Sequence, residues 1–151
     1  MNTSSTNHTC FLKTYDALHH ILGDVVFLGE RRSFDTAAKR FGEFRLLLEK
    51  HLKDEADVLL PRFARAAPEK RDTLEDIHAR RSHVLRCVDG VASTITSSDY
   101  SAFCFAMAEL DRALEAHRAA EEHVVHPALD RVLKNDTDWE SLCTQARFAH
   151  S

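Results

Sequence analysis

The spacing of apolar residues along the 151-residue chain predicts helices for almost its whole length. Apolar positions that recur three and four residues apart mark one face of a helix. Ser33, Asp35, Asp72 and Thr73 are good candidates for the residues that begin two of these helices. The pattern predicts helices over about 11–29, 33–66, 72–90 and 99–133, a polar connector over 93–99, and a short C-terminal helix around Trp139.

Four helices with short connections and one apolar stripe each favour an antiparallel up-and-down four-helix bundle. We therefore expect an all-α fold in which the chain, 1–151, is a single domain. Its core would span about 11–133, and 134–151 would add the extra C-terminal helix. The composition agrees, because the chain has only 4 glycines and 3 prolines and helices tolerate these residues poorly.

A weak internal repeat relates the second predicted helix to the fourth. The segment EKHLKDEADVLLPRF begins at Glu49, and the related segment EAHRAAEEHVVHPALDRVL begins at Glu115. Five positions recur at a constant offset: Glu49, His51, Glu55, Val58 and Pro61 return as Glu115, His117, Glu121, Val124 and Pro127. Both segments therefore follow one helix design, with a proline late in each helix where a kink is tolerable.

The repeated histidine and glutamate lie on predicted buried faces. Residues four apart share one face of a helix, and His51 and Glu55 continue the apolar stripe of the second helix. His117 and Glu121 lie within the stripe of the fourth. A buried carboxylate is costly unless it is paired or bound to a metal ion. Two buried carboxylates at equivalent positions therefore predict a shared metal site.

The first and third helices each carry a histidine that could join this site. His19 borders the apolar face of the first helix, and His20, which turns towards solvent, is the alternative. His78 lies in line with the apolar residues of the third helix, whereas His83 shares a face with charged residues. We therefore assign His19 and His78 inward.

Other polar residues near these positions are expected to have different roles. Glu122, His123 and His126 turn away from the metal stripe, and a surface position is expected for His126. Tyr15 lies one turn from His19, where core packing and a hydrogen bond to a metal-bound oxygen are both open.

The predicted donor set is mixed. Four imidazoles and two carboxylates suit first-row metals, iron and manganese above all. Two glutamates from facing helices can also bridge two ions. A single zinc ion needs only three or four ligands and would leave buried carboxylates unexplained. The chain shows no zinc-peptidase or nucleophile motif and no glycine-rich phosphate loop.

Charge and hydropathy exclude several classes of partner. The net charge of −4, without a basic stripe, argues against nucleic acid. No apolar run approaches the roughly 20 residues of a membrane span, and the N-terminus lacks the features of a signal peptide. The four cysteines form no Cys-x-x-Cys pair and are interpreted as free thiols of a reducing compartment. We therefore expect a cytoplasmic monomer or homodimer with a small-molecule partner.

The pattern of these residues resembles the hemerythrin-like, HHE cation-binding domain family. That family has a histidine on its first helix, His-x-x-x-Glu on its second, a histidine on its third and His-x-x-x-Glu on its fourth. The matching positions are His19 (or His20), His51 and Glu55, His78, and His117 and Glu121. The family's proline ten residues after each His-x-x-x-Glu histidine is met at Pro61 and Pro127.

The resemblance implies a non-haem di-iron centre, bridged by Glu55 and Glu121 and by an oxo or hydroxo group, with manganese or a mixed pair left open. Oxygen-carrying members place two histidines four apart on the third helix, but here Ser82 stands where the partner of His78 would be. The four-His, two-Glu set resembles instead bacterial proteins linked to repair of nitrosatively damaged iron–sulfur centres, and members that decompose peroxide.

The functional prediction is a di-iron protein that binds or reacts with a small oxidant: dioxygen, peroxide or nitric oxide. Peroxide-decomposing or nitric-oxide-linked activity would make it an enzyme, and the sequence leaves that open. The alternative is a non-catalytic module that senses or stores iron or dioxygen. A helical interaction domain without a metal is the third hypothesis, in which the buried carboxylates have no compensation.

Overall fold

The computed structural model describes residues 9–133 and 136–148, and every regular element in these ranges is a helix. The all-α prediction is confirmed. In chain order the elements are α2 (Thr9–Glu30), α3 (Phe34–Asp54), η1 (Glu55–Leu59), α4 (Leu60–Ala66), η2 (Pro68–Lys70), α5 (Arg71–Ser97), α6 (Tyr100–Ala120), η3 (Glu121–Val125), α7 (His126–Asp130) and α8 (Asp136–Phe148).

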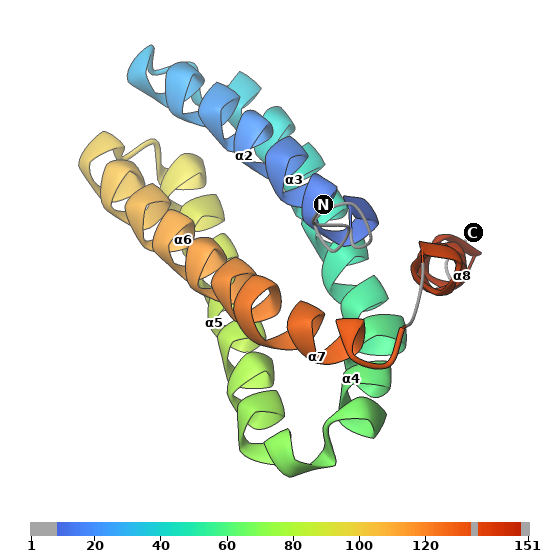
Figure 1. Cartoon of the computed structure of the whole chain (residues 1–151). Coiled ribbons are helices and arrows are strands. Elements are labelled where there is room, and N and C mark those ends of the chain that lie inside the picture. The colour runs from blue at the N-terminus through green and yellow to red at the C-terminus, as the bar shows by residue number, and fades with distance from the viewer. Residues whose placement is uncertain (1–8, 134–135, 149–151) are drawn as a thin grey trace.

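Two antiparallel hairpins build the bundle. Figure 1 shows α2 beside α3, and α5 beside α6, with the connections of both hairpins at the same end. The α2–α3 connection contains Arg32, at a positive φ of 59°. In the α5–α6 connection, Ser98 has φ 55°, and Asp99 accepts a hydrogen bond from the backbone N–H of Ala102. A left-handed residue followed at once by an N-cap makes this turn short and holds the two helices together.

Most of the polar segment 93–99 is helical, since only Ser98 and Asp99 form the connection between α5 and α6. Helix α5 continues to Ser97, well beyond the predicted end near residue 90. The side chains of Thr94, Thr96 and Ser97 donate hydrogen bonds to carbonyls three or four residues earlier. Such back-bonding lets hydroxyl residues sit within a helix. Ile95 is buried and continues the apolar stripe of α5, so packing overrides the polar composition of the segment.

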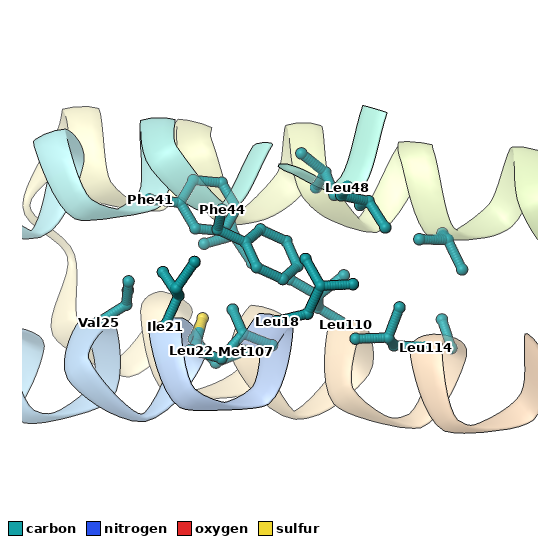
Figure 2. Close-up of a cluster of buried hydrophobic side chains, with 14 of the residues drawn as sticks. Leu18, Ile21, Leu22, Val25, Phe41, Phe44, Leu48, Met107, Leu110 and Leu114 are labelled. Carbon is teal, nitrogen blue, oxygen red and sulfur yellow. The ribbon is translucent and has the colours of Figure 1, made fainter. Parts of the chain in front are cut away.

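The core consists of two apolar clusters stacked along the bundle. The first lies between the hairpins, towards their connections, and Figure 2 shows its leucines and phenylalanines interdigitating from α2, α3 and α6. The second gathers residues of η1, α4 and α7 around Phe63, Leu129 and Trp139, the last of these from α8. On α3 the first cluster ends at Leu52 and the second begins at Val58 on η1. The break between the two clusters is where the polar residues of the repeat lie.

Two further findings concern membrane-spanning helices and the state of the cysteines. Within the described residues, no helix is long and apolar enough to cross a membrane. Cys87 and Cys104 are free thiols, as expected, but Cys143 is disulfide-bonded, so the expectation of four free thiols is wrong. The prediction of a reducing compartment, which was based on four free thiols, therefore loses part of its support.

Candidate metal centre

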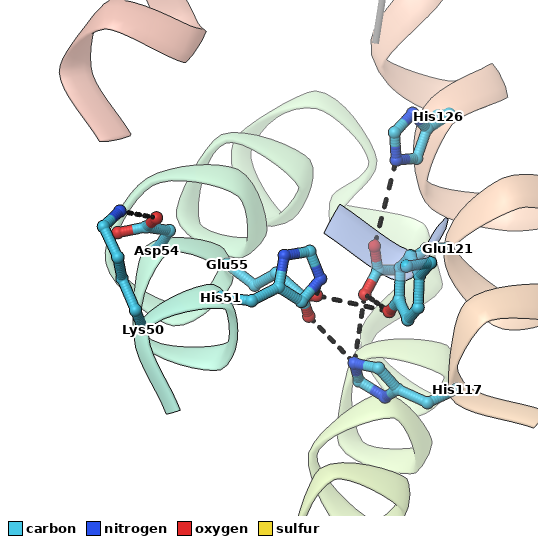
Figure 3. A network of polar contacts seen from close by, with 8 residues as sticks. Lys50, His51, Asp54, Glu55, His117, Glu121 and His126 are labelled. Carbon is cyan, nitrogen blue, oxygen red and sulfur yellow. Dashed lines mark hydrogen bonds and ion pairs between the residues drawn. The ribbon is translucent and has the colours of Figure 1, made fainter. Parts of the chain in front are cut away.

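A layer of buried polar side chains crosses the bundle between the two apolar clusters. His51, Glu55, His117, Glu121 and His126 are each at most 3% exposed, and both glutamates are completely buried. Figure 3 shows them converging from the two halves of the internal repeat. Burial of this kind costs free energy unless the polar atoms satisfy one another or an ion. The layer is therefore the candidate functional site.

Each glutamate of the repeat begins a short π-helix. In η1 the N–H of Leu60 donates to the carbonyl of Glu55, and in η3 the N–H of His126 donates to the carbonyl of Glu121. These are bonds between residues five apart. The proline that follows, Pro61 or Pro127, lacks an N–H, and its ring would clash with the carbonyl four residues earlier. A locally wider turn relieves that clash, and π-bulges are frequent at functional sites.

The wider turn brings His126 into the layer. In a π-helical turn, residues five apart lie over one another, so His126 follows Glu121 on the buried face. The prediction of a surface position for His126 is wrong, since the side chain is fully buried. A signal for its burial is present in the repeat. The equivalent residue of the first copy is Leu60, an apolar side chain just before the proline, which is also buried.

The two carboxylates alternate with three imidazoles. Oε1 of Glu55 is in close contact with Nε2 of His51, while its Oε2 is 2.8 Å from Nε2 of His117. Oε1 of Glu121 is 3.0 Å from the same His117 nitrogen, and its Oε2 is 4.0 Å from Nε2 of His126. Each glutamate thus presents its two oxygens to two different histidines (Figure 3). This is the arrangement that a bridging carboxylate requires.

Tyr15 reaches the layer from α2. Its hydroxyl donates a hydrogen bond of 2.7 Å to Oε1 of Glu121 and lies 3.4 Å from Oε1 of Glu55. Its ring meets the His51 imidazole edge-on, with centroids 4.8 Å apart. Core packing is confirmed, because Tyr15 is fully buried, and its hydroxyl bonds to the carboxylates. A hydrogen bond to a metal-bound oxygen stays a prediction.

Comparison with known proteins agrees with this geometry. The model of the hemerythrin HHE cation-binding domain matches residues 5–129, most of the chain. The chain belongs to the hemerythrin family of HHE cation-binding domains. Searches of curated proteins and of solved structures found no match. Membership indicates a metal-binding helical domain, and the buried polar layer is where its His-x-x-x-Glu motifs come together.

Four of the six predicted ligands converge in this hemerythrin-like domain: His51, Glu55, His117 and Glu121. Among the described residues, His51, Glu55 and Glu121 also form a group whose donor atoms all lie within 4.8 Å of one another. That these four residues bind a metal stays a prediction, but the structure brings them to one place as the repeat requires.

The structure places His19 and His78 elsewhere. His19 is partly buried, with Nε2 2.6 Å from Oε1 of Glu115 and Nδ1 3.7 Å from Asp111. The adjacent Leu18 takes the fully buried position on α2. His78 is exposed, so its inward assignment is wrong. It follows the buried Ile77, and one residue turns the side chain by about 100° around the helix.

The alternatives, His20 and His83, are exposed as well. Among the described residues, α2 and α5 therefore add no histidine to the layer. On α5 the buried stripe runs from Ile77, in the second apolar cluster, to Val84, in the first. Arg81 lies between them on the same stripe and is partly buried. Tyr15 is the residue of α2 that enters the layer, and Arg81 is the residue between Ile77 and Val84 on the buried stripe of α5.

The close packing of like and unlike charges shifts the pKa values of the layer. Burial opposes the charge of His117, but its hydrogen bonds to Glu121 and Glu55 prevail and raise the pKa of His117 to about 10. Burial and the negative charge of Glu55 raise the pKa of Glu121 to about 8. Burial works against the Glu55 charge, yet the neighbouring His51 outweighs it and holds the pKa of Glu55 well below its usual range. In the metal-free protein, His117 and Glu121 therefore hold protons at neutral pH, where a bound metal ion would supply the positive charge.

The donor atoms fit a transition-metal centre. Nε2 of His117 lies 2.8 Å from Oε2 of Glu55 and 3.0 Å from Oε1 of Glu121, so these three donor atoms are close enough to hold one ion together. Among the described residues, Oε2 of Glu121 has no hydrogen-bond partner, although it is completely buried. Imidazole and carboxylate donors together suit borderline first-row metals. An ion would satisfy the unused oxygen and replace the protons.

Proposed function

We propose that the protein holds two iron ions in the polar layer, bridged by Glu55 and Glu121, and that it binds or reacts there with dioxygen, peroxide or nitric oxide. The observation that carries this proposal is the position of the two carboxylates. Both are completely buried, and each has its two oxygens directed at different imidazoles.

The arrangement favours two ions over one. A single ion bound by His117 and one oxygen of Glu55 would leave the other oxygen of Glu55 facing His51. With two ions, each carboxylate can bind one ion through each oxygen, and the two glutamates offset part of the charge of two divalent metals. Iron is the first choice because the family is typically associated with it, and manganese has the same preference for mixed donors.

The chain's own residues would bind the ions, position the ligands and exclude water. His51 and His117 would supply nitrogen donors, and Tyr15 would hold Glu121 in place through its hydrogen bond of 2.7 Å. The iron, when bound, supplies the electron transfer to or from a small oxidant. The apolar clusters on both sides keep the layer dry, which strengthens every electrostatic contact in it.

The enclosure of the layer restricts the partner to small, uncharged molecules. His117, Glu55 and Glu121 are completely buried. A cavity of about 450 Å³ between α2 and α6 is lined by residues such as His19 and Met107 and by none of the five buried histidines and glutamates of the polar layer. An organic substrate in that cavity would therefore not touch the metal centre, whereas dioxygen, hydrogen peroxide and nitric oxide are small enough to reach a buried site.

Metal analysis of freshly purified protein tests the proposal. We expect about two irons per chain and iron–ligand absorption in the near-ultraviolet and visible range. Glu55→Gln keeps the shape of the side chain and removes the charge, so this variant should lose at least one ion. Glu115→Gln, at the half-exposed glutamate two residues before His117 in the sequence, is the matched control and should retain both.

Full iron content and an unchanged spectrum in Glu55→Gln would refute the site. Rapid mixing of the iron-loaded protein with peroxide, nitric oxide and oxygen then separates the functions. Catalytic loss of peroxide or nitric oxide would indicate an enzyme. A reversible spectrum with dioxygen alone would favour the alternative, a sensing or storage module.

A further inference from the structure

His126 is a third buried imidazole of the polar layer, five residues after Glu121 and completely enclosed. Its Nε2 lies 4.0 Å from Oε2 of Glu121, the carboxylate oxygen that does not face His117. Figure 3 shows the ring on the opposite side of Glu121 from His117. The position of the ring raises the question of what a histidine does there.

We propose that His126 is a direct metal ligand that binds, together with Oε2 of Glu121, the second ion of the centre. This inference rests on the proposed two-ion function and assigns a residue outside the repeated His-x-x-x-Glu motifs. It makes the centre asymmetric, because the equivalent residue of the first copy is Leu60.

The separation between the two atoms supports coordination over a direct hydrogen bond. Hydrogen bonds between nitrogen and oxygen have lengths of about 2.7–3.2 Å, so 4.0 Å is too long for one. Two metal–ligand bonds of about 2.0–2.2 Å each span up to about 4.4 Å. An ion between Nε2 of His126 and Oε2 of Glu121 can therefore contact both atoms at a wide angle without movement of the backbone.

The surroundings of His126 hold its ring in one orientation. Trp139 of α8 stacks on the imidazole, with centroids 5.5 Å apart and an interplanar angle of 16°. The indole Nε1–H of Trp139 donates a hydrogen bond of 3.0 Å to Asp130, which fixes the stack. Phe11 meets the ring at its edge, with centroids 6.5 Å apart. A ring held in this way is already positioned to bind an ion.

The internal repeat provides a comparison within the chain. Leu60 occupies the equivalent place in the first copy, after the corresponding π-helix η1 and before the corresponding proline, Pro61. It is only 2% exposed. A leucine therefore satisfies the packing requirements of this backbone position. The imidazole of His126 therefore adds a nitrogen donor that packing alone does not require, and this donor is directed at Oε2 of Glu121.

The test replaces His126 in the full-length protein with leucine, the residue of the other copy. Protein is loaded with Fe²⁺ without oxygen, and the proton NMR spectrum is recorded in water. Each coordinated imidazole contributes one strongly shifted, exchangeable N–H signal. We expect His126→Leu to lose one such signal relative to the wild type. Its affinity for the more weakly bound of the two ions should fall by at least about tenfold. His123→Leu, at an exposed histidine three residues away, is the control and should lose neither signal nor affinity.

A second variant separates coordination from hydrogen bonding. His126→Gln keeps a polar group at this position but supplies a poor metal ligand, so it should behave like His126→Leu. Restoration of wild-type affinity by glutamine would overturn the proposal. An unchanged number of shifted signals in His126→Leu would also overturn it while leaving the two-ion site intact. If wild-type protein binds no iron, both proposals fail together.

Discussion

Metal binding should release about two protons per chain near neutral pH. The raised pKa values mean that His117 and Glu121 carry protons in the metal-free protein, and a metal ion must displace them before it can bind. At pH 7 a pKa of about 10 leaves His117 almost fully protonated, and a pKa of about 8 leaves Glu121 protonated in about ten molecules of eleven. The two groups together release about two protons, and the raised pKa of His51 adds to that number.

The sign of the pH dependence follows from the same values. Protons compete with the metal wherever the pH lies below the pKa, so affinity rises with pH. The increase should be about 100-fold per pH unit below pH 8, where both groups must lose a proton, and about tenfold per unit between pH 8 and 10, where only His117 must. Raising the pH therefore tightens metal binding.

Calorimetric titration of Fe²⁺ or Co²⁺ in buffers of different ionisation enthalpy counts these protons. Glu121→Gln removes one titrating group and should lower the number released by about one. His78→Gln, at an exposed histidine, should leave the number unchanged. Release of fewer than one proton per chain by the wild type at pH 7, or an affinity that falls as the pH rises, would refute the reasoning.

Two further predictions concern residues around the layer. Tyr15→Phe removes the donor of the 2.7 Å hydrogen bond to Glu121. The variant should lower the free energy of unfolding of the metal-free protein by about 1–3 kcal/mol, measured by urea titration. An unchanged free energy of unfolding would contradict the role of the hydroxyl. Trp139 is the only tryptophan of the chain, and it stacks on His126. Metal loading should therefore quench the tryptophan fluorescence. Fluorescence that does not change as the ion binds would argue against an ion beside the His126 ring.

The helices and four of the six residues assigned to the site were predictable because they depend on short-range periodicity. Apolar residues three and four apart located the four long helices, and the same spacing placed the repeated His-x-x-x-Glu pairs on buried faces. His51, Glu55, His117 and Glu121 lie in one layer because two copies of the same helix design face each other. The cost of a buried carboxylate indicated that these pairs would meet.

His78 shows where periodicity is too coarse. The apolar residues of α5 allow two stripes that differ by one residue, one through Leu74 and His78 and the other through Ile77 and Val84. In the bundle, Ile77 and Val84 are completely buried and Leu74 is only partly buried. The choice between the stripes depends on how α5 packs against its neighbours, and a change of one residue turns a side chain by about 100°.

The helical fold, the repeat and the four residues that it brings together follow from which residues lie three or four apart in the chain. The entry of Tyr15 into the layer, the pairing of His19 with Glu115 and the burial of His126 depend instead on how the helices pack and turn. The physical reason is that a π-helical turn aligns residues five apart, so a histidine that a regular helix would turn outward faces Glu121 and the stacked Trp139.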